Sequence, residues 1–398
     1  MDVRSPGAAR TGRRRARDRL GLGMDTTTIR VSEPREMLAY LPHQLGFRPH
    51  ESAVAVSLRP PRGRIGLVAR VDLADLGDVV HGPQVARGLV AHLDADGADR
   101  AVLVLYTAQD PRASGSTPVA RAAAEHFREA AAAGLADVAV WVVTADGYLA
   151  LDCDDPGCCP PGGRPLRELE STAVGAQLVL TGSAVADCRA DVARIPSAGG
   201  DARRSVARVA ARWRARHARA LADGPAAVTA WRLASLAAWR GEVAAALAGA
   251  PSGGAPVLGR LEVALADTRV RDAVLVSLVP GPPDLPERSL REAPGATDAL
   301  VADAVAGIVD QQRGVVPPPV LTAAHVRVLE RVVGHGRRGA QAPACTLLAL
   351  LAWWQADGAR AGLLLERALE EDPDHRLARI LDRTLAVAMP PGWVRRAG

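Results

Sequence analysis

The sequence predicts an α/β half with a mixed, mostly parallel sheet flanked by helices, followed by an all-α half that ends in a tetratricopeptide-like helical hairpin. Two observations lead to this prediction. Short apolar stretches with a period of two alternate with helical patterns as far as residue 165, which is typical of strands joined by crossover helices. From residue 166 to residue 398 the apolar positions follow a helical period. We therefore expect an α/β domain at 25–165 and an α-helical domain at 166–398.

In the first half, a helix and an antiparallel hairpin precede the alternating elements. Ser32 is a suitable N-cap for a helix that ends at Gly46. Two apolar runs, 52–58 and 65–73, are separated by proline and glycine and predict the hairpin. A turn at 146–147 leads into an antiparallel edge strand. The elements between and after these are expected at 85–93 (helix), 101–107 (strand), 118–133 (helix), 138–144 (strand) and 148–151 (strand).

The second half reads as a series of helices separated by glycine- and proline-rich segments. We expect helices at 168–181, 187–194, 202–222, 225–248, 258–279, 297–312 and 321–333.

The last eighty residues contain a spacing of small and large residues that is typical of tetratricopeptide repeats, with a turn at 357–358. Stacked repeats usually need three or more copies, and one hairpin is evident here. Two interpretations stay open: a peptide-binding repeat surface, or an ordinary antiparallel helix pair. The residues at the repeat spacing are Leu348, Ala349, Ala361, Leu365, Ala368 and Pro373.

The net charge of +5 lies entirely at the N-terminus, because residues 1–23 contain seven arginines and two aspartates. We expect residues 1–24 to be a disordered basic leader. Met24 is an alternative start, and with that start the segment before it is not translated. The rest of the chain is electroneutral, which argues against nucleic acid as a partner. One arginine stripe with a spacing of four is nevertheless present, and we expect it to be a solvated face that pairs locally with acidic residues. Its members are Arg204, Arg208, Arg212 and Arg216.

Apolar runs and cysteines bear on the compartment. No apolar run reaches the roughly 18 residues that span a bilayer. Five cysteines, an odd number, do not suggest a secreted disulfide framework. We expect a cytoplasmic protein without a membrane partner.

The strongest chemical candidate is a C-x4-C-C-P segment that contains Cys153, Cys158 and Cys159. Thiolates bind zinc, and paired cysteines also cycle between thiol and disulfide. Neighbouring Cys158 and Cys159 are not expected to face one metal easily. Three interpretations therefore stay open: packing of a tight loop, a metal site that holds zinc, and redox or nucleophilic chemistry.

Polar residues follow two predicted strands at the ends where open α/β sheets bind ligands. Thr107, Gln109 and Asp110 follow one strand, and Thr144 and Asp146 follow the next. These side chains could hold a small polar ligand or a metal, although the same residue types are common in ordinary loops. Arg70 and Asp72 are possible neighbours of this site.

Two segments carry a resemblance to a known family: residues 42–54, PHQLGFRPHESAV, and residues 153–163, CDDPGCCPPGG. They resemble signature segments of an actinobacterial family known only as domain of unknown function 4192. Residues 70–73 and 353–373 are similar to its other landmarks, so the resemblance covers nearly the whole chain. It implies a cytosolic actinobacterial protein and brings no activity with it.

The first hypothesis is a non-enzymatic binding or adaptor protein that holds a protein partner through its helical half. The alternative is an enzyme or a metal or redox protein built around the three clustered cysteines. A weaker alternative is association with nucleic acid through the arginine stripe. A polar pocket that contains the cysteines and strand-end carboxylates would favour the second hypothesis.

Overall fold

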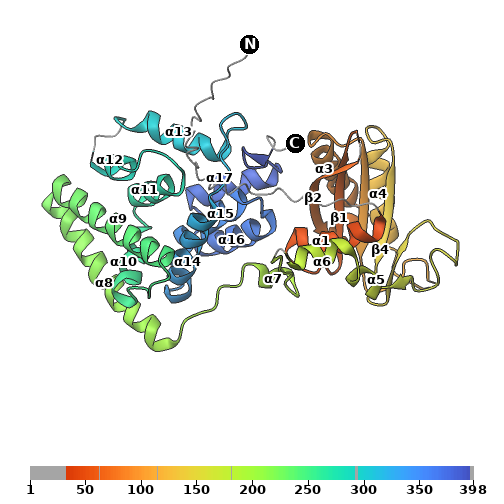
Figure 1. The fold of residues 1–398 in the computed structure, drawn as a ribbon, viewed down its shortest axis with the longest axis horizontal. Coiled ribbons are helices and arrows are strands. Elements are labelled where there is room, and N and C mark those ends of the chain that lie inside the picture. The colour runs from red at the N-terminus through yellow and green to blue at the C-terminus, as the bar shows by residue number, and fades with distance from the viewer. Residues whose placement is uncertain (1–32, 62, 114, 181, 292–294, 395–398) are drawn as a thin grey trace, which may run out of the picture.

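The computed structural model describes residues 33–61, 63–113, 115–180, 182–291 and 295–394, so the expected leader at 1–24 lies outside the described residues. Figure 1 shows a sheet with its helices at one end and a larger group of helices at the other. Among the described residues, none of the helices combines the length and the apolar character needed to cross a membrane.

The sheet has six strands in the order β2-β1-β3-β4-β5-β6. Among the described strands, only β3 and β4 pair in parallel, and the other four pairings are antiparallel. The fold is therefore mixed α/β, and the prediction of a mostly parallel sheet is wrong. The strands are β1 (Ser52–Arg59), β2 (Arg64–Asp72), β3 (Arg100–Tyr106), β4 (Val138–Val143), β5 (Gly147–Ala150) and β6 (Arg164–Pro165).

The physical reason lies in the position of β1. Strands β2, β3 and β4 all run in the same direction, as helical connections between them require. Strand β1 is inserted between β2 and β3 and runs against both. The helical connection through residues 73–95 therefore joins β2 and β3, which run in the same direction but are not neighbours in the sheet.

Helices cover both faces of the sheet. Strand β1 is buried on both sides: Ala53 and Ala55 belong to the core on one face, and Val54 and Val56 to the core on the other. Phe127 of α4 lies fully buried in the first of these cores. These helices are α1 (Pro34–Leu45) on the second face, and α2 (Leu73–Gly77), α3 (Gly82–Ala95) and α4 (Val119–Ala131) on the first.

Short helices lead from the sheet to the helical half. The expected helix at 168–181 is two helices, α5 and α6, which are interrupted at Ser171 and Thr172. Figure 1 shows that an extended segment follows α7 and reaches the long helix α8. The bounds are α5 (Arg167–Glu170), α6 (Ala173–Leu180), α7 (Arg189–Val192) and α8 (Gly200–Asp223).

The remaining helices share one large apolar core. The expected helix at 258–279 is also two helices, because the Asp267 side chain accepts a hydrogen bond from the Val270 N–H and caps a new start. These helices are α9 (Pro225–Leu247), α10 (Ala255–Ala264), α11 (Thr268–Leu278), α12 (Leu285–Arg291), α13 (Asp298–Val309) and α14 (Pro319–His335).

The C-terminal helices are α15 (Ala342–Trp354), α16 (Gly358–Glu371) and α17 (Arg376–Ala386). Asp357 caps α16 by accepting a hydrogen bond from the Arg360 N–H, at the expected turn. Every residue of α15 except Pro343 is buried. Helix α15 is therefore an interior element of the helical core and presents no free face.

Candidate functional site

An open groove with a volume of about 790 Å³ lies at the end of the sheet where β3 and β4 finish. The loop after β3 and the loop after β5 form its walls. The structure thus brings together three polar residues and two cysteines that the sequence singled out. These are Gln109, Asp110, Asp146, Cys153 and Cys159.

The cysteine loop folds as a tight turn. The carbonyl of Asp155 accepts hydrogen bonds from the N–H groups of Cys158 and Cys159, at 3.1 and 2.7 Å. The turn returns Cys159 to the sheet, where the Ala150 N–H lies 3.4 Å from its Sγ atom. This turn brings the thiols of Cys153, Cys158 and Cys159 close to one another.

The Sγ atoms of Cys153, Cys158 and Cys159 all lie within 4.8 Å of one another, and those of Cys158 and Cys159 are 3.9 Å apart. A tetrahedral zinc ion with Zn–S bonds of about 2.3 Å requires sulfur separations of about 3.8 Å. The three sulfur atoms would therefore have to approach one another only slightly to bind such an ion. Cys158 and Cys159 were not expected to face one metal easily, but the turn places their Sγ atoms 3.9 Å apart.

The three thiols differ in exposure: Cys153 is half-buried, Cys158 exposed and Cys159 buried. Hydrogen bonding with the Cys159 and Cys153 side chains raises the pKa of the Cys158 thiol to about 11. The Cys158 thiol is therefore protonated at neutral pH, and a metal ion that binds its sulfur must displace that proton.

Arg112 joins the two walls of the groove. Its guanidinium donates to the Asp110 carboxylate at 3.1 Å and to the carbonyl oxygens of Cys153 at 2.9 Å and Pro160 at 3.2 Å. Both charged side chains are largely buried, with 17% and 14% exposure. Sequence reasoning missed this residue, and the only available signal was its place two residues after Asp110 in a strand-end loop.

The Asp110 carboxylate stays ionised in this setting. Burial alone raises the pKa of Asp110, but hydrogen bonds from the Arg112 side chain and backbone N–H hold the pKa below its ordinary value. The ion pair is neutral as a whole, and its guanidinium end lies against the carbonyl groups of the cysteine loop.

The other predicted site residues lie elsewhere along the same sheet end. The Arg70 guanidinium donates to the Ser52 hydroxyl at 2.7 Å and pairs with Asp72 at 2.5 Å. Both residues lie on β2, which β1 separates from β3, and neither lines the groove. Thr107 directly follows β3, and its N–H donates to the Val143 carbonyl at 3.1 Å.

Gly147 allows the cysteine loop to return to the sheet. A Cβ atom at this position would lie 2.6 Å from the carbonyl oxygens of Arg164 and Gly162. We expect Gly147→Ala to lower the free energy of unfolding by about 1–3 kcal/mol, because the β5–β6 pairing must move. Gly88→Ala, in α3 with open space around it, should be neutral or stabilising. Urea unfolding of both variants measures the difference, and equal stabilities would contradict this account.

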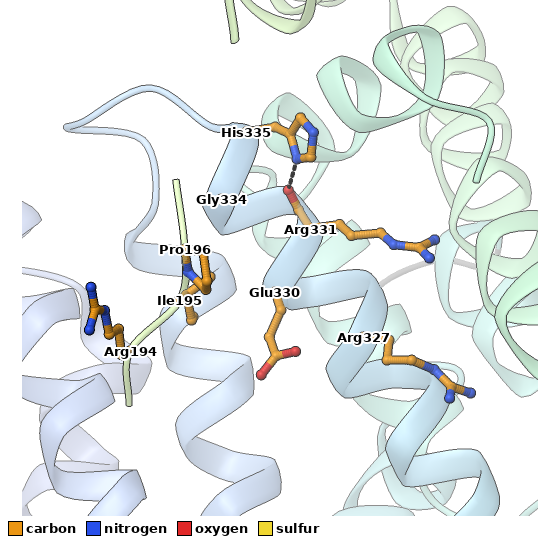
Figure 2. Close-up of a pocket in the computed structure, with 8 residues that line it drawn as sticks. All are labelled: Arg194, Ile195, Pro196, Arg327, Glu330, Arg331, Gly334 and His335. Carbon is orange, nitrogen blue, oxygen red and sulfur yellow. Dashed lines mark hydrogen bonds between the residues drawn. The ribbon is translucent and has the colours of Figure 1, made fainter. Parts of the chain in front are cut away.

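A second cavity, of about 290 Å³, lies between α14 and the segment before α8. Figure 2 shows Arg327 and Arg331 extending to one side of α14, whereas Arg194 extends to the other. Glu330 pairs with Arg360 at 2.6 Å, and His335 Nδ1 donates to the Arg331 carbonyl at 2.8 Å. Because the guanidinium groups diverge, this cavity forms no convergent anion site.

Comparison with known proteins identifies the family. A family model described as a domain of unknown function, DUF4192, matches residues 34–392, nearly the whole chain. No curated protein and no solved structure gives a significant match. The matched range includes the sheet, the cysteine loop and the helical half, and the chain belongs to the DUF4192 family.

Proposed function

We propose that this protein is a metal-dependent ligand-binding protein of the cytosol, in which Cys153, Cys158 and Cys159 hold a zinc ion. The observation that supports this proposal is the mutual approach of three sulfur atoms to within 4.8 Å. Thiolate sulfur is a preferred ligand of zinc, and zinc sites with three protein ligands keep a fourth position for water or another ligand.

The exposure of the thiols argues against a purely structural loop. A cysteine that serves packing is buried, whereas Cys158 is exposed although its sulfur is directed at the other two. A reducing compartment such as the cytosol would keep all three thiols available.

The groove supplies the place for a ligand. Three thiolates around a divalent ion would leave a net negative charge, and the Arg112 guanidinium, although paired with Asp110, directs its N–H donors at the same loop. Gln109, Ser116 and Asp146 line the groove and offer hydrogen-bonding groups to a small polar molecule. A zinc ion held by the three cysteines would act as a Lewis acid towards that molecule.

The test is zinc binding by the full chain. We expect one zinc per chain by native mass spectrometry, and a Co²⁺ derivative with strong thiolate-to-metal absorption. Cys158→Ser should abolish stoichiometric binding, because two thiols do not suffice. Cys188→Ser is the matched control, since Cys188 is also exposed but lies outside the cluster. A wild-type chain that stays metal-free in excess zinc would overturn the proposal.

The prediction of a protein partner on the helical half stays a prediction. The first helix of the tetratricopeptide-like hairpin, α15, is buried and offers no docking face. The geometry of the cysteine groove therefore supports the metal-site function better than the adaptor function.

A further inference from the structure

Helix α8 lies along the outer edge of the helical half, on the side away from the sheet (Figure 1). It carries seven arginines and two aspartates, a net charge of +5 on 24 residues. Since the sequence from residue 24 onward is electroneutral as a whole, this helix is a strong local concentration of positive charge.

The apolar side of α8 is already used. Val206, Ala210, Trp213 and Ala220 are buried against neighbouring helices. The arginines therefore occupy the opposite, solvent-facing side. We define the α8 arginine face as Arg204, Arg208, Arg212, Arg216 and Arg219, all exposed.

Local ion pairing, which the sequence led us to expect, occurs at one end only. Arg204 pairs with Asp201, in the first turn of α8. Among the described residues, no carboxylate lies within 4 Å of Arg208, Arg212, Arg216 or Arg219. The expectation of local pairing with acidic residues is therefore wrong for three of the four arginines of the predicted stripe, Arg208, Arg212 and Arg216.

The geometry of the α8 arginine face is regular and in part fixed. From Arg204 to Arg219 it extends about 22 Å along one straight helix, at 1.5 Å per residue. The Arg216 guanidinium lies over the Trp213 ring at 5.5 Å from its centroid, and the neighbouring Arg260 lies over the same ring at 5.0 Å. Such stacking lowers the entropy that an arginine loses when it binds an anion.

We propose that the α8 arginine face binds the phosphate backbone of duplex nucleic acid without sequence preference. Duplex DNA carries one negative charge per about 1.7 Å of its axis, so a linear row of unpaired arginines meets phosphates in any register. Protein interfaces usually need exposed aromatic or large aliphatic anchors, and alanines lie between the arginines of this face. Insertion into a membrane would need an apolar side, which α8 buries within the protein.

The experiment measures fluorescence anisotropy of a labelled 24-base-pair DNA duplex with the full chain, between 50 and 200 mM salt. With four to five phosphate contacts, affinity is expected to fall roughly 100- to 1,000-fold over this range. The variant R208A/R212A/R219A should bind weakly, and its log-affinity slope against log salt should be smaller by about 3.

Two full-length controls separate this surface from charge alone. R87A/R338A/R376A removes three exposed arginines outside α8, and R13A/R14A/R15A removes three from the basic N-terminal segment. In both control variants the α8 arginine face is unchanged, so its contribution to DNA affinity should equal that in the wild type. Equal losses in all three variants, a loss confined to the N-terminal variant, or no duplex binding by the wild type would overturn the proposal. Binding to phosphatidylserine vesicles without binding to DNA would overturn it as well.

Discussion

Replacing Arg112 with alanine is expected to weaken zinc binding at the cysteine cluster by about 10- to 100-fold. Arg112 touches no thiol directly, but it holds the carbonyl groups of Cys153 and Pro160 and so fixes both ends of the cysteine loop. Its loss also leaves the largely buried Asp110 carboxylate without its charge partner. We expect this second effect to lower the free energy of unfolding by about 2–3 kcal/mol.

Competition with a chromophoric chelator measures the zinc affinity, and urea unfolding measures the stability. Arg121→Ala is the matched control, because Arg121 donates to the Pro111 carbonyl at 2.9 Å and does not reach the cysteine loop. Zinc affinity in Arg112→Ala equal to that of the control would show that Arg112 does not position the ligands.

Replacing Phe127 with alanine is expected to lower the free energy of unfolding of the sheet half by about 3–5 kcal/mol. The Phe127 side chain is fully buried between α4 and the sheet, and the cavity left behind cannot collapse without moving strands. Val79→Ala, at a position 83% exposed, should change stability by less than about 0.5 kcal/mol.

The same variant tests the predicted boundary near residue 165. Trp141 is in the sheet half, and the other six tryptophans follow residue 200, so fluorescence reports mainly on the helical half. If the halves unfold as separate units, Phe127→Ala should release bound zinc at lower urea while the tryptophan transition stays in place. A common shift of both signals would show one cooperative unit.

Local patterns predicted strands β1 to β5 but not the two-residue β6, whereas the order of the strands depended on tertiary contacts. The sequence predicted the hairpin, the crossover through α4 and the turn before β5, because apolar periodicity and the turn-forming residues glycine and proline are features of a few neighbouring residues. The insertion of β1 between β2 and β3 was not visible. Its alternating alanines and valines are buried on both faces, and such a strand gives no sign of its neighbours.

The candidate site shows a similar division. Strand ends and clustered cysteines are readable from the sequence, and the structure places Asp110, Asp146, Cys153 and Cys159 around one groove. The role of Arg112 could not be predicted from the sequence, because three of its partners are backbone carbonyls, which leave no pattern in the sequence.

The place of β1 between β2 and β3 has a consequence for synthesis on the ribosome. Strand β1 pairs with β2 almost at once, but its second neighbour, β3, ends about 47 residues after β1. The hairpin is complete when β2 ends at Asp72, 34 residues before β3 ends at Tyr106. At roughly 5–20 residues per second, the nascent hairpin exposes a bare, apolar edge for roughly 2 to 7 seconds. During that interval the edge can pair with another nascent chain, so a chaperone that shields it should raise the yield of native protein.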